Sequence, residues 1–188
     1  REEDQSICKL DTNEAITIRE LLTKRGTEIM GPTWIEGKRF PILIKWLDCQ
    51  ERLSLQVHPP AELAVKLGGE PKTENWYVVK SWNNSGLFLG FNKEVSKSQF
   101  EKALKENKAE DVCNRIESKP NDSVLVKSGR IHAIDAGNLI LEIQQNSDTT
   151  YRVYDWGRTG LDGKPRKLHI QESLESIDFQ DNNQSALK

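Results

Sequence analysis

The feature that most constrains the fold of this chain is a series of short strand-like stretches. They recur along the chain and follow one another closely toward its C-terminal end. Residues 53–58 alternate apolar and polar side chains with a period of two, and two prolines close the stretch. Residues 123–127, 138–145 and 150–156 form three such stretches in succession, with no helical pattern between them. This order favours a mainly β barrel or sandwich with helical insertions over a parallel sheet, whose strands are joined by helices.

Three further strands are expected, at residues 40–48, 74–80 and 87–91. The pattern of the intervening segments predicts short helices at residues 18–23 and 61–67. Another helix is expected to open at Ser98, whose spacing to Glu101 is that of a capping box, and helical turns are expected at residues 112–116. The helices are therefore insertions between strands.

The length of 188 residues suits one domain, which we expect to span residues 1–188 with a polar, fraying tail at 178–188. The chain has 27 basic and 29 acidic side chains, a formal net charge of −2, and no long basic block. Binding to nucleic acid through phosphate neutralisation is therefore not expected. The longest apolar run, at residues 40–47, is far too short to cross a membrane.

The three cysteines Cys8, Cys49 and Cys113 are odd in number and widely spaced. They form neither a disulfide framework nor a Cys-x-x-Cys zinc site. Their pattern favours a reducing compartment, and no secretory signal peptide is visible, so we expect a cytoplasmic protein. The chain opens on charged residues without a methionine, so we expect it to begin inside a longer protein. Its oligomeric state does not follow from the sequence.

Polar side chains gather on one face of the stretch at residues 53–58. In an extended strand, Ser54, Gln56 and His58 point to the same side. Such a face is either solvated or lines a cavity that binds a metal ion, and spacing alone leaves both interpretations open.

Two later residues extend the metal interpretation. Glu74 stands at the start of an expected strand, and His132 follows Gly129, which permits a tight turn. Each of the two alone is typical of a surface side chain. Combined with Gln56 and His58, they offer two imidazoles, a carboxylate and an amide oxygen, a set that suits zinc and also accepts manganese or iron.

Segments at residues 40–48, 54–59, 72–77, 129–134 and 141–155 resemble the type I mannose-6-phosphate isomerases in order and spacing. The similarity runs from about Ile18 to Ile177. It implies a cupin fold, a jelly-roll-like β-barrel with short helical insertions. It also implies one divalent metal ion, zinc or another, held by the four residues Gln56, His58, Glu74 and His132.

The resemblance assigns catalysis to Arg152, with Glu142 and Lys72 as candidates for the base that transfers the proton. Without the resemblance, a lone arginine in a strand is expected to point outward. We expect Ser54, Lys72 and Arg158 to contact the substrate. The chain departs from the family at Lys127, where a proline is usual, and the family's first strand has no counterpart in it.

The function implied is interconversion of mannose 6-phosphate and fructose 6-phosphate through a cis-enediol. The alternative is a cupin that binds a sugar or sugar phosphate without catalysis, although binding alone requires neither Arg152 nor Glu142. A metal-dependent oxygenase fits less well, since its usual site keeps open positions beside two histidines and one carboxylate, and an added ligand at Gln56 does not match that pattern.

Overall fold

The computed structural model describes residues 5–82, 84–160 and 163–182. The chain forms two compact units, Arg1–Leu43 and Ile44–Lys188, and each is described by itself. Among the described residues, no helix combines the length and the apolar character needed to cross a membrane.

The first unit holds a two-stranded antiparallel sheet and one helix. These elements are β1 (Ile7–Lys9), β2 (Ala15–Thr17) and α1 (Ile18–Met30). Thr17 caps the helix through a reciprocal capping box with Glu20. The helix runs beyond the predicted residues 18–23, and Gly26 lies inside it without ending it. A Cβ atom at residue 26 would collide with the ring of Trp34. The backbone of α1 is non-helical only at Arg25.

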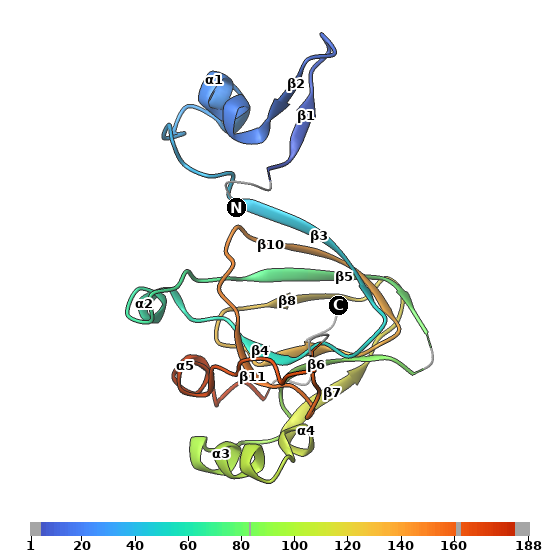
Figure 1. The fold of residues 1–188 in the computed structure, drawn as a ribbon. Helices are drawn as coiled ribbons and strands as arrows, with labels where there is room; N and C mark the ends of the chain where they lie inside the picture. Colours follow the sequence, from blue (N-terminus) through green and yellow to red (C-terminus); the bar gives the residue numbers. More distant parts are fainter. Residues whose placement is uncertain (1–4, 83, 161–162, 183–188) are drawn as a thin grey trace. The chain divides into compact units, whose positions relative to one another are not determined.

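The second unit is built from two sheets (Figure 1). The four-stranded sheet has the order β3 (Ile42–Cys49), β10 (Asn138–Gln145), β5 (Glu74–Ser81) and β8 (Ser123–Val126). The five-stranded sheet has the order β11 (Tyr151–Tyr154), β4 (Leu55–Val57), β9 (His132–Ile134), β6 (Gly86–Phe91) and β7 (Cys113–Glu117). Strands of the five-stranded sheet pair antiparallel throughout.

Apolar side chains from both sheets form the core between them. Trp76, Val78 and Ile140 come from the four-stranded sheet and meet Leu87 and Leu89 of β6. Strand alternation explains this, since every second residue of β5 and β10 points inward. The mainly β architecture predicted from the sequence is confirmed.

Helices cover the other face of the five-stranded sheet. These are α3 (Lys97–Lys105), α4 (Ala109–Val112) and α5 (Ile170–Ser176), while the short α2 (Ala61–Ala64) follows β4. Phe100 of α3 and Leu174 of α5 pack with Phe88 and Val57 in a second core cluster. These helices pack on the side of the five-stranded sheet that faces away from the four-stranded sheet. The space between the two sheets therefore contains strand residues, including the polar ones described below.

Two predictions of local structure were wrong, and one helix was missed. The capping box of α3 is formed by Ser96 and Gln99, two residues before the predicted Ser98 and Glu101. Cys113 begins strand β7 in place of the predicted helical turns at 112–116, because it pairs with β6. Helix α5 was not predicted at all.

The described part of the predicted tail is held in place. The backbone nitrogen of Asp178 donates to the Gly129 carbonyl at 2.8 Å, and Phe179 stacks on Phe91 with 5.7 Å between ring centroids. Asp181 accepts hydrogen bonds from Arg130 at 2.7 and 2.8 Å. Residues 178–182 are therefore not frayed, and the remainder of the predicted tail, 183–188, lies outside the described residues.

Candidate metal centre

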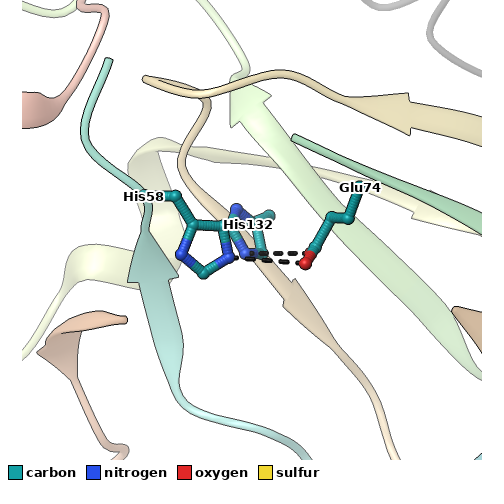
Figure 2. A group of neighbouring side chains, drawn as sticks. All are labelled: His58, Glu74 and His132. Carbon is teal, nitrogen blue, oxygen red and sulfur yellow. Dashed lines mark ion pairs between the residues drawn. The ribbon is translucent and has the colours of Figure 1, made fainter. Parts of the chain in front are cut away.

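Three side chains from separate strands converge in the interior of the second unit (Figure 2). His58 directly follows β4, Glu74 begins β5 and His132 begins β9. Their candidate ligand atoms all lie within 4.8 Å of one another. His58 Nε2 is 3.5 Å from Glu74 Oε2, and His132 Nε2 is 3.4 Å from Glu74 Oε1.

The facing atoms of this cluster have no hydrogen-bond partner in the described structure. His58 Nε2, His132 Nε2 and both carboxylate oxygens of Glu74 are buried and unsatisfied. One such atom costs on the order of 1–3 kcal/mol, and more when it is charged. A cation bound between the three side chains would satisfy all four atoms at once, so the residues fit a metal ion.

A hydrogen bond at the second ring nitrogen, Nδ1, fixes the orientation and the tautomer of each imidazole. His58 Nδ1 lies 2.9 Å from the carbonyl oxygen of Thr149, and His132 Nδ1 lies 2.8 Å from that of Arg130. A carbonyl oxygen can only accept, so both Nδ1 atoms donate and, in the neutral ring, Nε2 keeps its lone pair toward Glu74. This is the orientation that a metal ligand requires.

Burial also keeps both imidazoles neutral. Desolvation lowers the pKa of His132 to about 3, although the carboxylate of Glu74 acts in the opposite direction. The pKa of His58 is well below its ordinary value, first because of burial and then because of the nearby Lys72. Neutral imidazoles are the form that binds metals, so both rings are ready to coordinate near neutral pH.

Strand register places Gln56 and Arg152 beside His132. Arg152 of β11 is paired with Gln56 of β4, which is paired with His132 of β9. Directly paired residues of antiparallel strands point to the same face, at about 5 Å between Cβ atoms. The three side chains therefore form one row on the inner face, with Gln56 next to His132 and Arg152 next to Gln56.

Arg152 is held by neighbours on both of its flanks. Its Nε donates to Ser54 Oγ at 3.2 Å, and Nη1 donates to the Lys167 carbonyl at 3.0 Å. Its backbone nitrogen donates to His169 Nδ1 at 3.3 Å. Nothing local in the sequence shows that residue 169 returns to β11, so this contact could not be predicted.

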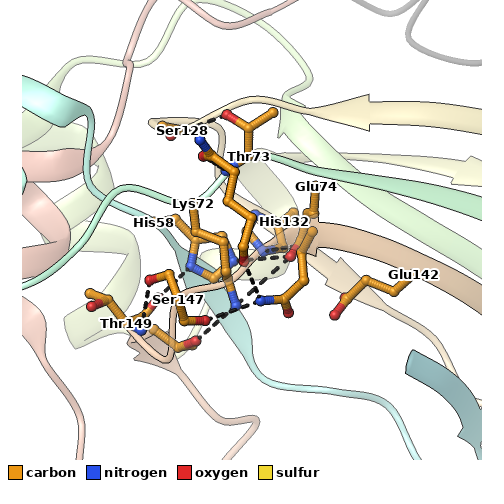
Figure 3. Close-up of polar contacts among 12 residues, drawn as sticks. His58, Lys72, Thr73, Glu74, Ser128, His132, Glu142, Ser147 and Thr149 are labelled. Carbon is orange, nitrogen blue, oxygen red and sulfur yellow. Dashed lines mark hydrogen bonds and ion pairs between the residues drawn. The ribbon is translucent and has the colours of Figure 1, made fainter. Parts of the chain in front are cut away.

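Lys72 is buried at the rim of the cluster (Figure 3). Its Nζ lies 3.8 Å from Glu74 Oε2 and 3.4 Å from Thr150 Oγ1. Desolvation lowers the pKa of Lys72, while the carboxylate of Glu74 acts in the opposite direction. A buried amine with a depressed pKa is a recurrent feature of catalytic sites.

Glu142 lies on the same interior face, in a network that the sequence only partly revealed. Its carboxylate accepts from Lys45 Nζ at 3.0 Å and from Trp76 Nε1 at 3.2 Å. Lys45 also donates to the side-chain oxygen of Gln144. The indole of Trp76 in turn packs edge-on against the ring of His132, with centroids 5.4 Å apart. Sequence reasoning missed Lys45 and the role of Trp76.

Arg158 lies at a surface cavity, apart from the cluster of His58, Glu74 and His132. Its guanidinium binds Asp155 Oδ1 at 2.8 Å and Glu51 at 3.5 Å. It lines a surface cavity with Arg52 and Arg166, and none of the three clustered ligands lines that cavity. Its role in substrate binding stays a prediction.

Similar proteins bear on what this centre does. No family model matches the chain. The chain is 42% identical over 176 residues to the mannose-6-phosphate isomerase ManA of Bacillus subtilis, covering 93% of this chain and 55% of that protein. It superimposes on the crystal structure of the mannose 6-phosphate isomerase from Bacillus subtilis with a TM-score of 0.82 at 35% identity, covering 94% of this chain and 55% of that one.

This chain belongs to the mannose-6-phosphate isomerase family. The predicted cupin fold is thereby confirmed. A zinc-bound mannose 6-phosphate isomerase also shares the fold, with a TM-score of 0.63 at 15% identity, covering 94% of this chain and 64% of that one. The chain spans about half the length of the curated family members it matches.

Proposed function

We propose that this chain carries the metal-dependent active site of an isomerase that interconverts mannose 6-phosphate and fructose 6-phosphate. The observation that supports this most directly is the set of four buried, unpartnered atoms on His58, Glu74 and His132. The position of Arg152 in the same row as His132 adds a cationic group where such a reaction needs one.

The metal ligands we propose are His58, Glu74 and His132, with Gln56 as the fourth. Zinc is the proposed ion, because it accepts this mixture of nitrogen and oxygen donors and because a zinc-bound isomerase shares the fold. Other divalent metals remain compatible with the donor set. When bound, the ion supplies Lewis-acid polarisation of the sugar oxygens.

Arg152 is proposed to stabilise the negative charge that develops on the enediol oxygens. Its guanidinium is positioned in advance by Ser54 and by the Lys167 carbonyl, so little reorganisation is needed during the reaction. Ser54 is itself buried beside β4, where it can also contact the substrate. We therefore propose Ser54 and Lys72 as substrate-binding residues, together with Arg158 from its separate position.

The base that moves the proton between C1 and C2 is proposed to be Glu142 or Lys72. Glu142 is oriented by Lys45 and Trp76, which leave its carboxylate in one fixed position. Lys72 has a depressed pKa through burial, so its neutral amine is more accessible than that of an exposed lysine. Substituting each in turn separates the two.

The proposal is tested by a coupled isomerase assay on metal-stripped and zinc-reconstituted protein. We expect activity only with metal, and Arg152→Ala to lower kcat by about 100-fold or more. Arg152→Lys, which keeps the charge but changes its geometry, is the matched variant and is expected to retain more activity. Full turnover by metal-stripped protein would exclude this mechanism.

A second measurement separates catalysis from binding alone. The protein is incubated with fructose 6-phosphate in deuterated water, and incorporation of deuterium at the carbon that loses the proton is followed by NMR. Exchange supports the isomerase. Binding of the sugar phosphate without exchange would favour a non-catalytic cupin.

We also propose a cytoplasmic location for the protein. The three cysteines are free, which supports this proposal, because disulfides are rare in a reducing compartment.

A further inference from the structure

Residues 166–169 run beside β11, the strand that carries Arg152. This strand lies at the edge of the five-stranded sheet, next to β4. Arg166 Nε donates to Asp155 Oδ2 at 2.7 Å, directly after the end of β11. His169 then precedes helix α5, which lies beside β11 (Figure 1). We call residues 166–169 the edge segment, because they cover backbone groups that an edge strand otherwise leaves to water.

Three hydrogen bonds join the edge segment to Arg152. The backbone nitrogen of His169 donates to the Arg152 carbonyl at 2.8 Å, and the backbone nitrogen of Arg152 donates to His169 Nδ1 at 3.3 Å. The third bond runs from Arg152 Nη1 to the Lys167 carbonyl, at 3.0 Å. Each residue has a single backbone N–H, so the bond to His169, and not pairing with β4, holds this group of Arg152.

The bond from the Arg152 amide fixes the tautomer of His169. An amide N–H can only donate, so Nδ1 of His169 carries a lone pair and, in the neutral ring, the proton lies on Nε2. His58 and His132 have the opposite arrangement, because their Nδ1 atoms donate to carbonyl oxygens. Burial lowers the pKa of His169, which favours the neutral ring, although Glu172 acts in the opposite direction. The imidazole is therefore in the form that can accept from Arg152.

Helix α5 anchors His169 from its other side. The His169 carbonyl accepts from Ser173 Oγ at 2.6 Å and from the Ser173 backbone nitrogen at 2.9 Å. Ser173 is fully buried, and the next residue, Leu174, belongs to the core cluster that includes Val57 of β4. The imidazole is thus attached to a packed helix, and a group held in this way can fix the position of the residue that it contacts.

We propose that His169 is a positioning residue, which holds the backbone of Arg152 so that its guanidinium stays beside Gln56 and the metal centre. This inference rests on the proposed catalytic role of Arg152. A cation that stabilises developing charge must be in place before the reaction, and a displacement of about 1 Å can cost up to about 100-fold in rate. His169 supplies that restraint at the edge of the sheet.

The proposal is tested by the variants His169→Leu, His169→Gln and His169→Asn in the coupled isomerase assay, on zinc-reconstituted protein. Asparagine carries its side-chain amide as far from the backbone as Nδ1, whereas glutamine carries it as far as Nε2. We expect His169→Leu and His169→Gln to lower kcat roughly fivefold to tenfold with little change in KM, and His169→Asn to retain most of the activity. Gln171→Leu, an exposed position on α5, is the control and should match the wild type.

A double-mutant cycle shows whether His169 acts through Arg152. Once Arg152 is replaced by alanine, His169→Leu should lower kcat no further, because the group that it positions is gone. A loss by the same factor in both backgrounds would mean that His169 only supports the fold, and it would overturn the proposal.

Hydrogen exchange of the Arg152 amide gives a reading that does not depend on activity. The amide should be protected in the wild type and in His169→Asn, and it should exchange faster in His169→Leu and His169→Gln. Equal protection in all four proteins, or a wild-type kcat in His169→Leu, would overturn this inference alone. A wild-type kcat in Arg152→Ala would contradict the proposed function itself, and this inference with it, so the two failures are distinguishable.

Discussion

The two faces of the four-stranded sheet carry opposite chemistry. The inner face buries Glu74 and Glu142 and turns Lys45 inward, whereas the outer face exposes Trp46 and Ile143. An antiparallel sheet with one solvated face ordinarily shows the reverse arrangement. Both departures are unfavourable for an isolated, unliganded chain, because buried ionisable groups lose hydration and exposed apolar groups order water. The difference teaches that one sheet can bury ionisable groups on one face and expose apolar groups on the other, and the inner arrangement is the one expected where a metal ion binds.

Metal binding at the inner face should give the largest change in the free energy of unfolding. Zinc at about a thousand times its dissociation constant is expected to raise the free energy of unfolding by about 4 kcal/mol. Glu74→Gln keeps the volume of the side chain but removes the charge between His58 and His132, so this gain should vanish. Thermal denaturation with and without zinc measures it.

The control for that variant is Glu62→Gln, on the exposed surface of α2. It should respond to zinc as the wild type does. If Glu74→Gln were stabilised by zinc to the same extent as the control, the inner cluster would not be the binding site.

A matched pair on β10 compares the faces directly. Ile140 is fully buried between the sheets, whereas Ile143 is 42% exposed on the outer face. Ile140→Ala should lower the free energy of unfolding by about 3 kcal/mol, through lost burial and a cavity. Ile143→Ala should cost less than about 1 kcal/mol, because this side chain is largely exposed.

Urea denaturation at low protein concentration checks this pair. Equal losses would mean that Ile143 is packed in the isolated chain and that the two faces do not differ as described.

The sequence predicts features that depend on neighbouring residues, and it does not predict contacts between residues far apart in the chain. The bounds of β10 were predicted as observed, because residues 138–145 are rich in apolar β-formers and are followed by the turn residues 146–148. The histidine and carboxylate ligands were predicted from motifs and from the resemblance. The contact of Lys45 could not be predicted, since the group it binds, Glu142, is 97 residues away.

The elements that the sequence analysis missed also depend on contacts between distant residues. Helix α5 has few apolar residues, and its amphipathic pattern becomes meaningful only once Leu174 packs against the five-stranded sheet. Cys113 was assigned to helical turns because Val112 and Ile116 have a helical spacing, yet pairing with β6 overrides that local preference. Register, which places Arg152 beside Gln56, is a property of two strands and is not encoded in either alone.

Trp76→Phe should produce an intermediate effect on the inner face. The change removes the indole donor to Glu142 and leaves space beside the ring of His132. We expect a loss of about 2 kcal/mol in the free energy of unfolding, from the missing hydrogen bond and the reduced packing. Zinc stoichiometry should be unchanged, because Trp76 is not a ligand, and kcat should fall more than KM rises.

Trp46→Phe is the matched control on the outer face, where the indole is 63% exposed. It should leave both stability and kcat of the dilute protein near the wild-type values. A Trp76→Phe enzyme with an unaltered kcat would show that Trp76 packs in the core without positioning Glu142.

Lys45→Met should give the smallest effect. The lysine side chain is 39% exposed, so water can replace part of its contact with Glu142, and the expected loss of stability is about 1 kcal/mol. Adding Glu142→Gln removes the charge that Lys45 neutralises, so the two changes together should cost less than the sum of the single changes. A double-mutant cycle in urea measures this coupling. Strict additivity would mean that the ion pair contributes nothing to the inner face, and that Glu142 is oriented by Trp76 alone.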